Sequence, residues 1–192
     1  MLKQKLSDKE LVKLYLKGDE YALECLINRH RDKVYTSIYM FVKDTYLAED
    51  IFQETFIKVV DTLRSGKYHE EGKFLPWVLR IAHNLCIDFF RKTKRSPSVT
   101  NPEGFDIFNI LVFAEENAEQ KIIKNQTHRK VRQLLEELPQ EQKEIVILRH
   151  YANLSFKEIA NITGVSINTA LGRMRYALIN LRKIIEEKAI SL

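Results

Sequence analysis

Apolar residues recur along this chain at intervals of three and four positions, whereas strict alternation of apolar and polar residues is rare. This spacing places apolar side chains on one face of an α-helix. Only 6 glycines and 4 prolines are present, so long stretches contain no helix breaker. The pattern therefore predicts an all-α protein.

Four helices are predicted in the first half of the chain. The sequence SDKE at 7–10 has the spacing of a capping box and predicts a helix beginning after Ser7. Asp19 is a candidate cap for the next helix, and Pro76 is expected to open a helix that runs to about Lys92. The residues expected to be buried by the second, third and fourth helices are Leu23, Ile27, Val34, Ile38 and Phe41; Ala48, Ile51, Phe52, Val59 and Leu63; and Val78, Ile81 and Leu85.

The composition changes in the stretch KTKRSPSVTNPEG, where prolines, a glycine and short polar residues predict irregular structure. We therefore expect two small helical domains, at 1–95 and 126–192, joined by a flexible linker at 96–125. Lys and Arg outnumber Asp and Glu in both domains, by 18 to 14 and by 11 to 7, whereas the linker holds 5 acids and 2 bases. Basic domains suit a polyanionic partner, although charge alone is explained more simply by a solvated surface.

The second domain contains SFKEIANITGVSINTALGRMRYAL at 155–178, which predicts two helices separated by a tight turn at Gly164. Ser155 with Glu158 forms a second capping-box pattern, and Ser166 can cap the second helix. Such a unit is typical of a helix-turn-helix, whose second helix enters the DNA major groove, although a plain helical hairpin with surface arginines is the alternative. The candidate DNA-binding residues are Asn168, Thr169, Gly172, Arg173, Arg175 and Tyr176, and Arg173 is suited to pair with guanine.

The first domain carries two other candidate surfaces. On the helix FLPWVLRIAHNLCIDFFRKTKR at 74–95, amide and guanidinium groups off the apolar stripe can hold an unpaired base, and the basic end attracts phosphates. These candidate residues are Arg80, Asn84, Arg91 and Lys92. On the helix at 46–63, acidic residues beside an apolar one favour a protein partner, although a solvated acidic face is the common alternative. The candidates there are Asp50, Gln53, Glu54 and Ile57.

Other chemistry is not indicated. Two cysteines, Cys25 and Cys86, do not imply a disulfide framework, and each pairs with only one nearby histidine, which is too few ligands for a metal site. No glycine-rich phosphate loop or nucleophile elbow is present. We therefore expect a protein that is not an enzyme and has no cofactor or metal. Because no signal peptide or membrane-spanning run is apparent, we expect a cytoplasmic protein without direct membrane insertion.

Three segments occur together in a characteristic order: YLAEDIFQETFIKVV, FLPWVLRIAHNLCIDFFRK, and LPQEQKEIVILRHYANLSFKEIANITGVSINTALGRMRYAL. In this combination the chain resembles the extracytoplasmic-function (ECF) sigma factors of bacterial RNA polymerase, over nearly its whole length. The resemblance implies that the domain at 1–95 is like sigma region 2 and binds core polymerase and the minus-ten element. It implies that the domain at 126–192 is like sigma region 4 and reads the minus-thirty-five element.

The resemblance also implies residue roles. The surface around Asp50, Gln53 and Glu54 would dock on the clamp helices of the polymerase large subunit, and Asn84 would lie near the pocket for a base of the melted minus-ten element. Promoter DNA, duplex and melted, and an anti-sigma factor are the other implied partners. Leu171 and Gly172 stand where many family members carry a lysine and a serine, so the promoter sequence does not transfer.

Two other functions would use parts of this chain. A helix-turn-helix repressor or response-regulator output protein would explain 126–192, but it leaves 46–95 without a role. A helical adaptor that binds only proteins would explain the acidic helix, but not the arginines beside the Gly164 turn.

Overall fold

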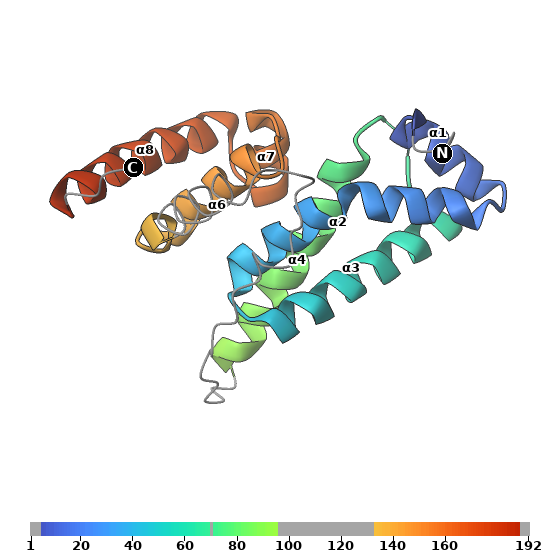
Figure 1. Ribbon diagram of the computed structural model, residues 1–192, viewed down its shortest axis with the longest axis horizontal. Helices are drawn as coiled ribbons and strands as arrows, with labels where there is room; N and C mark the ends of the chain where they lie inside the picture. The colour runs from blue at the N-terminus through green and yellow to red at the C-terminus, as the bar shows by residue number, and fades with distance from the viewer. Residues whose placement is uncertain (1–4, 70, 96–132, 189–192) are drawn as a thin grey trace, which may run out of the picture. The chain divides into compact units, whose positions relative to one another are not determined.

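The computed structural model describes residues 5–69, 71–95 and 133–188, and these residues fall into two separate compact units (Figure 1). Within these ranges all regular secondary structure is helical, which confirms the predicted fold class. The expected linker at 96–125 lies outside the described residues, so the domain boundaries stay predictions. No helix in the described ranges is both long enough and apolar enough to span a membrane.

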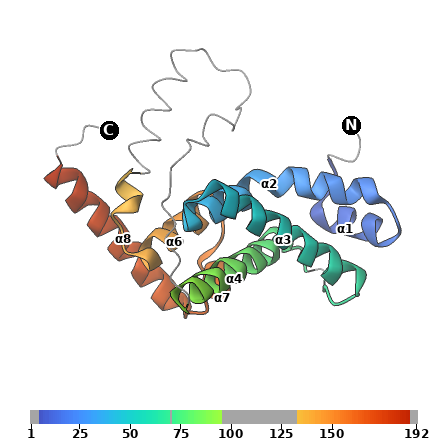
Figure 2. The same cartoon turned by 90° about the horizontal axis from the view of Figure 1, so that it is seen from below.

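The first unit consists of α1 (Asp8–Leu16), α2 (Glu20–Val42), α3 (Thr45–Arg64) and α4 (Phe74–Arg95). Figures 1 and 2 show α2, α3 and α4 lying alongside one another, with α1 against the first half of α2. Their apolar stripes meet in one core, whose largest fully buried side chains are Leu11, Leu26, Ile38, Met40, Leu63, Phe74 and Leu79. This packing leaves the opposite faces of α3 and α4 exposed.

Local sequence explains most of the helix ends. Ser7 forms the predicted capping box, because its backbone amide donates to Glu10 over 2.8 Å and its hydroxyl accepts from the Glu10 amide over 3.3 Å. Two expectations need correction. Asp19 stands at the N-cap of α2, but its side chain makes no capping hydrogen bond. The fourth helix begins at Phe74 rather than Pro76, since the first turn of a helix tolerates a proline that has no amide to donate.

Ion pairs of Asp8 connect α1 to α2. The Asp8 carboxylate lies 2.7 Å from Nη1 of Arg29 and 2.8 Å from Nε2 of His30, which is buried and packs against the ring of Phe74. Burial acts to raise the pKa of Asp8, but the hydrogen bonds and charges of His30 and Arg29 outweigh it and lower that pKa below its ordinary value of 3.8. The position of α1 therefore depends on an ionised carboxylate.

The second unit contains a helical turn at 133–136, then α6 (Gln140–His150), α7 (Phe156–Thr163) and α8 (Ile167–Glu187). Its core includes Leu135, Ile145, Ile159, Ala170 and Ala177. Pro139 stands at the N-cap of α6. The amide side chain of Asn180 donates to Gln142 over 2.8 Å, and Lys188 pairs with Glu137, so the second half of α8 is attached to the rest of this unit.

Candidate polymerase and nucleic-acid interfaces

The outer face of α3 carries the candidate docking residues. Asp44 caps the helix by accepting from the Leu47 amide over 2.9 Å, and the inner face buries residues such as Ala48, Ile51 and Val59. Helical periodicity then turns the four candidates Asp50, Gln53, Glu54 and Ile57 outward, and all four are exposed. Ile57 is 60% exposed, so one large apolar side chain stands among the acidic ones on this face.

The outer face of α4 carries the four candidate minus-ten residues, Arg80, Asn84, Arg91 and Lys92, and each of them is exposed. Arg91 lies 3.7 Å from Asp88, but both side chains are largely in solvent, so this pair holds the guanidinium only weakly. Arg80 and Asn84 are one helical turn apart and face the same way. The amide of Asn84 therefore stands beside a cation on the exposed face of α4.

The loop before α4 packs on the start of that helix through aromatic rings. The ring of Tyr68 lies 4.3 Å from that of Trp77 between centroids, and Phe74 completes the cluster at 5.8 Å from Trp77. Sequence reasoning placed no aromatic contact in this polar loop, although a lone tyrosine between glycines is a signal that could have indicated it.

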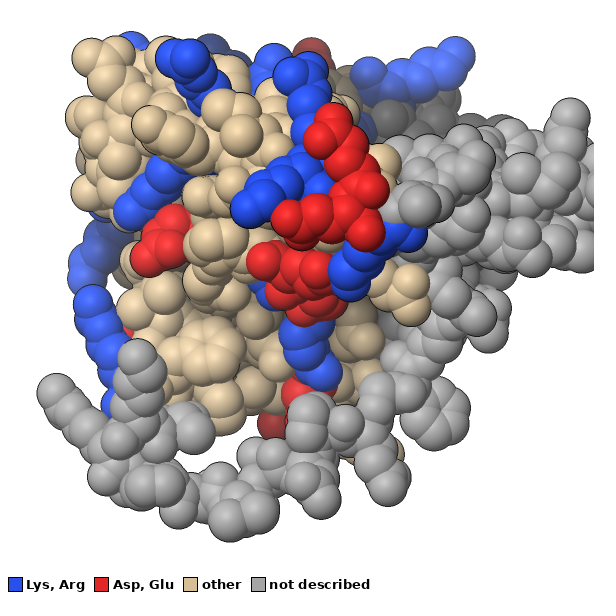
Figure 3. Space-filling view, turned by 90° about the vertical axis from the view of Figure 1, so that its left-hand side faces the viewer, with Lys and Arg blue, Asp and Glu red and all other residues tan. Residues whose placement is uncertain are grey.

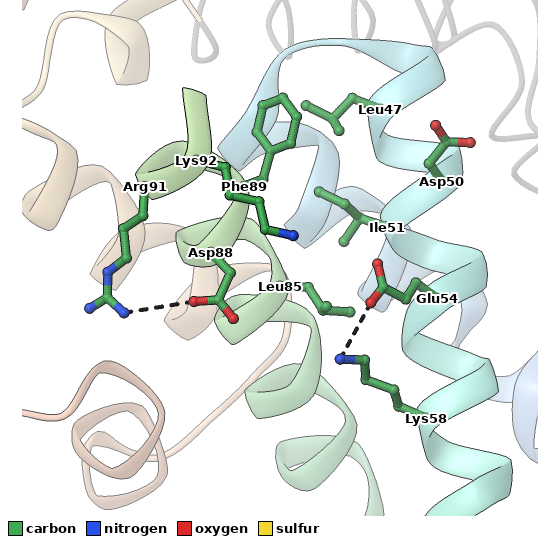
Figure 4. A pocket seen from close by; sticks show the side chains of 10 residues that line it. All are labelled: Leu47, Asp50, Ile51, Glu54, Lys58, Leu85, Asp88, Phe89, Arg91 and Lys92. Carbon is green, nitrogen blue, oxygen red and sulfur yellow. Dashed lines mark ion pairs between the residues drawn. The ribbon is translucent and has the colours of Figure 1, made fainter. Parts of the chain in front are cut away.

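A groove of about 590 Å³ brings the two surfaces of the first unit together (Figure 4). Its floor is apolar, and its walls come from α3 and α4. In Figure 4, Glu54 pairs with Lys58 at 3.3 Å on one wall, and Lys92 extends from the other wall toward α3. The residues that line the groove are Leu47, Asp50, Ile51, Glu54, Lys58, Leu85, Asp88, Phe89, Arg91 and Lys92. No sequence pattern indicated that the docking and DNA-binding candidates would lie next to each other.

The turn between α7 and α8 has the geometry expected of a helix-turn-helix. Gly164 has φ +69°, a left-handed conformation that favours glycine, and the Val165 amide donates to the carbonyl of Ala160 over 3.1 Å. Ser166 then caps α8 by accepting from the Thr169 amide over 3.0 Å. The two hydroxyl groups of this pair are also 2.8 Å apart, so the side chain of Thr169 takes part in the cap.

The first three turns of α8 present the remaining candidates. Asn168, Arg175 and Tyr176 are exposed, whereas Gly172 and Arg173 are half-buried. Within the described residues, neither Arg173 nor Arg175 pairs with a carboxylate. A β-carbon added at Gly172 would meet no atom of this unit within 4 Å, so the glycine is not required by packing. This end of α8 therefore presents two cations and, at Gly172, a backbone that no side chain covers.

Charge elsewhere on the molecule is mixed. On the face drawn in Figure 3, acidic side chains stand next to basic ones, and further basic side chains are scattered around them. Lys183 pairs with Glu187 at 3.6 Å near the end of α8, and Lys143 with Glu136 at 2.9 Å. The start of α8 differs from these places, because Arg173 and Arg175 have no carboxylate partner within the described residues. In the described ranges no cluster of three or more His, Cys, Asp or Glu residues could hold a metal ion.

Comparison with known proteins gives matches over both units. The family model of sigma-70 region 2 matches residues 26–96, and that of sigma-70 region 4 matches residues 128–176. The chain is 28% identical over 179 residues to the ECF RNA polymerase sigma factor SigW of Bacillus subtilis, covering 91% of this chain and 95% of SigW. It is 32% identical over 169 residues to the ECF sigma factor SigE of Mycolicibacterium smegmatis, covering 86% of this chain and 63% of SigE.

Two solved structures have a similar fold. One is CnrH in complex with the cytosolic domain of CnrY, at a TM-score of 0.66 and 19% identity, covering 94% of this chain and 97% of that one. The other is the sigma factor RpoE in complex with the anti-sigma factor NepR from Bartonella quintana, at a TM-score of 0.65 and 17% identity, covering 85% and 96%. At these levels of sequence identity, the two matches show a shared helical fold.

Proposed function

Because this chain belongs to the ECF sigma factors of the sigma-70 family, we propose that its two helical units divide promoter recognition between them. Sigma factors are initiation factors rather than enzymes: they bind core RNA polymerase and direct it to promoter DNA. In the proposed division, the first unit docks on the polymerase and engages the minus-ten element. The second unit reads the minus-thirty-five element in duplex DNA.

The observation that carries this division is the contrast in chemistry between the outward faces of α3, α4 and α8. The face of α3 is acidic with an exposed isoleucine, which suits a protein and repels DNA. The face of α4 combines Arg80 with Asn84, whose amide can pair with the edge of an extruded base. The start of α8 follows a helix-turn-helix bend and presents Arg173, which can read guanine in the major groove.

We also propose an anti-sigma factor as a partner of this chain. The support is the family, together with the NepR complex of a similarly folded sigma factor. Purification of the tagged chain from its native cells, before and after stress, would test this: a stoichiometric protein that leaves when core polymerase joins is expected. Recovery only of free chain and polymerase under every condition would contradict it.

Transcription from a library of genomic fragments tests the main proposal. Core polymerase with the purified chain is expected to start transcripts at a set of sites that share two spaced elements, and core polymerase alone is not. A matched reaction uses the chain without polymerase and measures duplex binding, which should be weak. Tight, specific duplex binding by the chain alone, with no new start sites in the presence of polymerase, would indicate a repressor instead.

A further inference from the structure

The second turn of α8 carries an exposed apolar residue among the candidate DNA-binding residues. Leu171 is 44% exposed and follows the Ser166 cap by five positions, which places it about 7.5 Å along the helix axis. Ala170 and Ala177, both fully buried, define the core face of α8, and Leu171 is turned about 100° from Ala170 around the axis. The leucine therefore stands outside the core, at the end of α8 that adjoins α7 (Figure 1).

Leu171 shares its side of α8 with two polar candidates. Asn168 is three positions before it and Arg175 is four positions after it, the spacing at which side chains on a helix surface are neighbours. All three side chains are exposed. The next residue, Gly172, has no side chain, and a β-carbon added there would meet no atom of this unit within 4 Å. A partner that contacts Asn168 and Arg175 therefore also meets the side chain of Leu171.

A leucine at this place limits which base the helix can recognise in the major groove. There, all four bases present hydrogen-bonding atoms, and only thymine adds an apolar group, its C5-methyl. Leucine has no donor or acceptor, so a polar base edge held against it would lose water and gain no hydrogen bond. The thymine methyl gains from the same contact, because both surfaces are apolar. Leu171 is thus suited to favour thymine over the other three bases.

We propose that Leu171 is a specificity-determining residue, whose side chain contacts the C5-methyl of a thymine in the minus-thirty-five element. This inference rests on the proposed function, since it requires the start of α8 to read duplex DNA. It deepens that function by naming the base and the group recognised. It also predicts that the upstream element contains an A·T pair at the position that Leu171 faces.

Uracil isolates this contact, because it lacks only the C5-methyl of thymine and forms the same pair with adenine. Once transcript mapping has located the upstream element, each of its thymines, on either strand, is replaced in turn by uracil in a duplex promoter. The affinity of the chain bound to core polymerase should fall about fourfold at one position, which corresponds to the burial of one methyl group. Leu171→Ala should bind the thymine promoter about fourfold more weakly and no longer distinguish thymine from uracil there.

Leu178→Ala is the matched control. Leu178 is 43% exposed on the same helix, but it lies two turns further from the Ser166 cap, about 10 Å along the axis. Its loss should leave the original preference for thymine over uracil unchanged. Leu171→Met keeps an apolar side chain and should also retain that preference. Unchanged far-UV circular dichroism and melting temperature would show that the variants remain folded.

The possible outcomes separate this inference from the proposed function. Absence of any upstream sequence preference would contradict the proposed function itself. If the element is recognised but contains no thymine, or if uracil is tolerated at every position, the methyl contact is wrong and the reading helix stands. The same holds if Leu171→Ala keeps the full preference for thymine. Weaker binding of Leu171→Ala to core polymerase, with that preference intact, would place Leu171 against protein and overturn the inference.

Discussion

Asp50 on α3 and Lys92 on α4 line opposite walls of one groove, so the proposed polymerase and DNA contacts share a single depression (Figure 4). The acidic wall repels phosphates, whereas the basic wall attracts them. A DNA strand that follows α4 would therefore be held at the side of Lys92 and kept from the face of α3. The groove thus marks the boundary between the two surfaces.

Lys92→Ala tests this boundary. Loss of one phosphate contact should lower the slope of log affinity against log salt by about 0.7–0.9 for promoter binding by the holoenzyme, while affinity for core polymerase stays within twofold. Lys58→Ala is the matched control, since Lys58 lines the same groove but pairs with Glu54 on the acidic wall. A drop in core affinity for Lys92→Ala would mean that polymerase occupies the whole groove.

The roles of Arg173 and Asn84 can be separated on two kinds of template. Arg173→Ala should cost about 1–3 kcal/mol and relax base preference at one upstream position, because the guanidinium is proposed to read duplex DNA. Asn84→Ala should spare the closed complex and impair opening, because its amide is proposed to act on an extruded base. Permanganate footprinting reports the opening step directly.

Templates already unpaired at the minus-ten element provide the control. They should partly rescue Asn84→Ala, since melting then costs less, and should not rescue Arg173→Ala. Equal failure of both variants on both templates would contradict the division of labour between the two units. Normal opening by Asn84→Ala would remove the base-capture role from that residue.

The two glycines around the start of α8 should respond to alanine with opposite signs. Gly164→Ala forces a β-carbon into a left-handed conformation and should destabilise the second unit by about 1 kcal/mol. Gly172→Ala lies inside α8 with open space around it and should stabilise the unit by about 0.5–1 kcal/mol. Denaturant unfolding followed by far-UV circular dichroism measures both.

Gly172→Ala then becomes a probe of DNA contact. If the DNA backbone approaches α8 closely at this position, the more stable variant should bind the upstream element more weakly. Affinity that is unchanged or higher would show that DNA binding does not depend on the absence of a side chain at position 172. The same pair of variants thus distinguishes a glycine that shapes the turn from one that faces a partner.

Asp8→Asn should make the first unit less stable near neutral pH and leave it unaffected in acid. The Asp8 pKa is lower in the folded protein than its ordinary value, so its contribution is present above about pH 4 and is lost as pH falls through the folded value. We expect a loss of about 1 kcal/mol at pH 7 because the carboxylate is only partly buried. Fluorescence of Trp77, the chain's single tryptophan, follows unfolding of this unit.

The control for this prediction is Asp32→Asn, an exposed acid on α2, which should change stability by less than 0.5 kcal/mol. The difference between Asp8→Asn and the original chain should shrink as the pH is lowered below 4. A constant difference across this range would mean that the asparagine disturbs packing rather than the charge.

Local signals predicted the helices well, because capping and periodicity depend on residues that are close in sequence. Both capping boxes, at Ser7 and Ser155, form as expected. The outward positions of Asp50, Asn84 and Arg175 follow from the 3.6-residue period alone. The resemblance to the ECF sigma factors, recognised from three segments, is confirmed by the family matches.

Features that depend on how helices meet could not be predicted. Phe41 and Ile81, expected in the core, are half-buried because packing also decides where a stripe ends. Phe41 packs edge-on to the ring of His83. No sequence pattern predicts this contact between α2 and α4. For the same reason the groove and the contact of Tyr68 with Trp77 appear only in three dimensions.

The attachment of α8 has a consequence for how such proteins diverge. Ala170, Ala177 and the hydrogen bond from Asn180 to Gln142 fix the rotation of this helix about its own axis. Apart from Thr169 in the cap, its outward positions near the turn have room for other side chains, as the open space around Gly172 illustrates. Substitutions there can accumulate without loss of the fold, so promoter preference can drift between lineages while the scaffold that presents it stays the same.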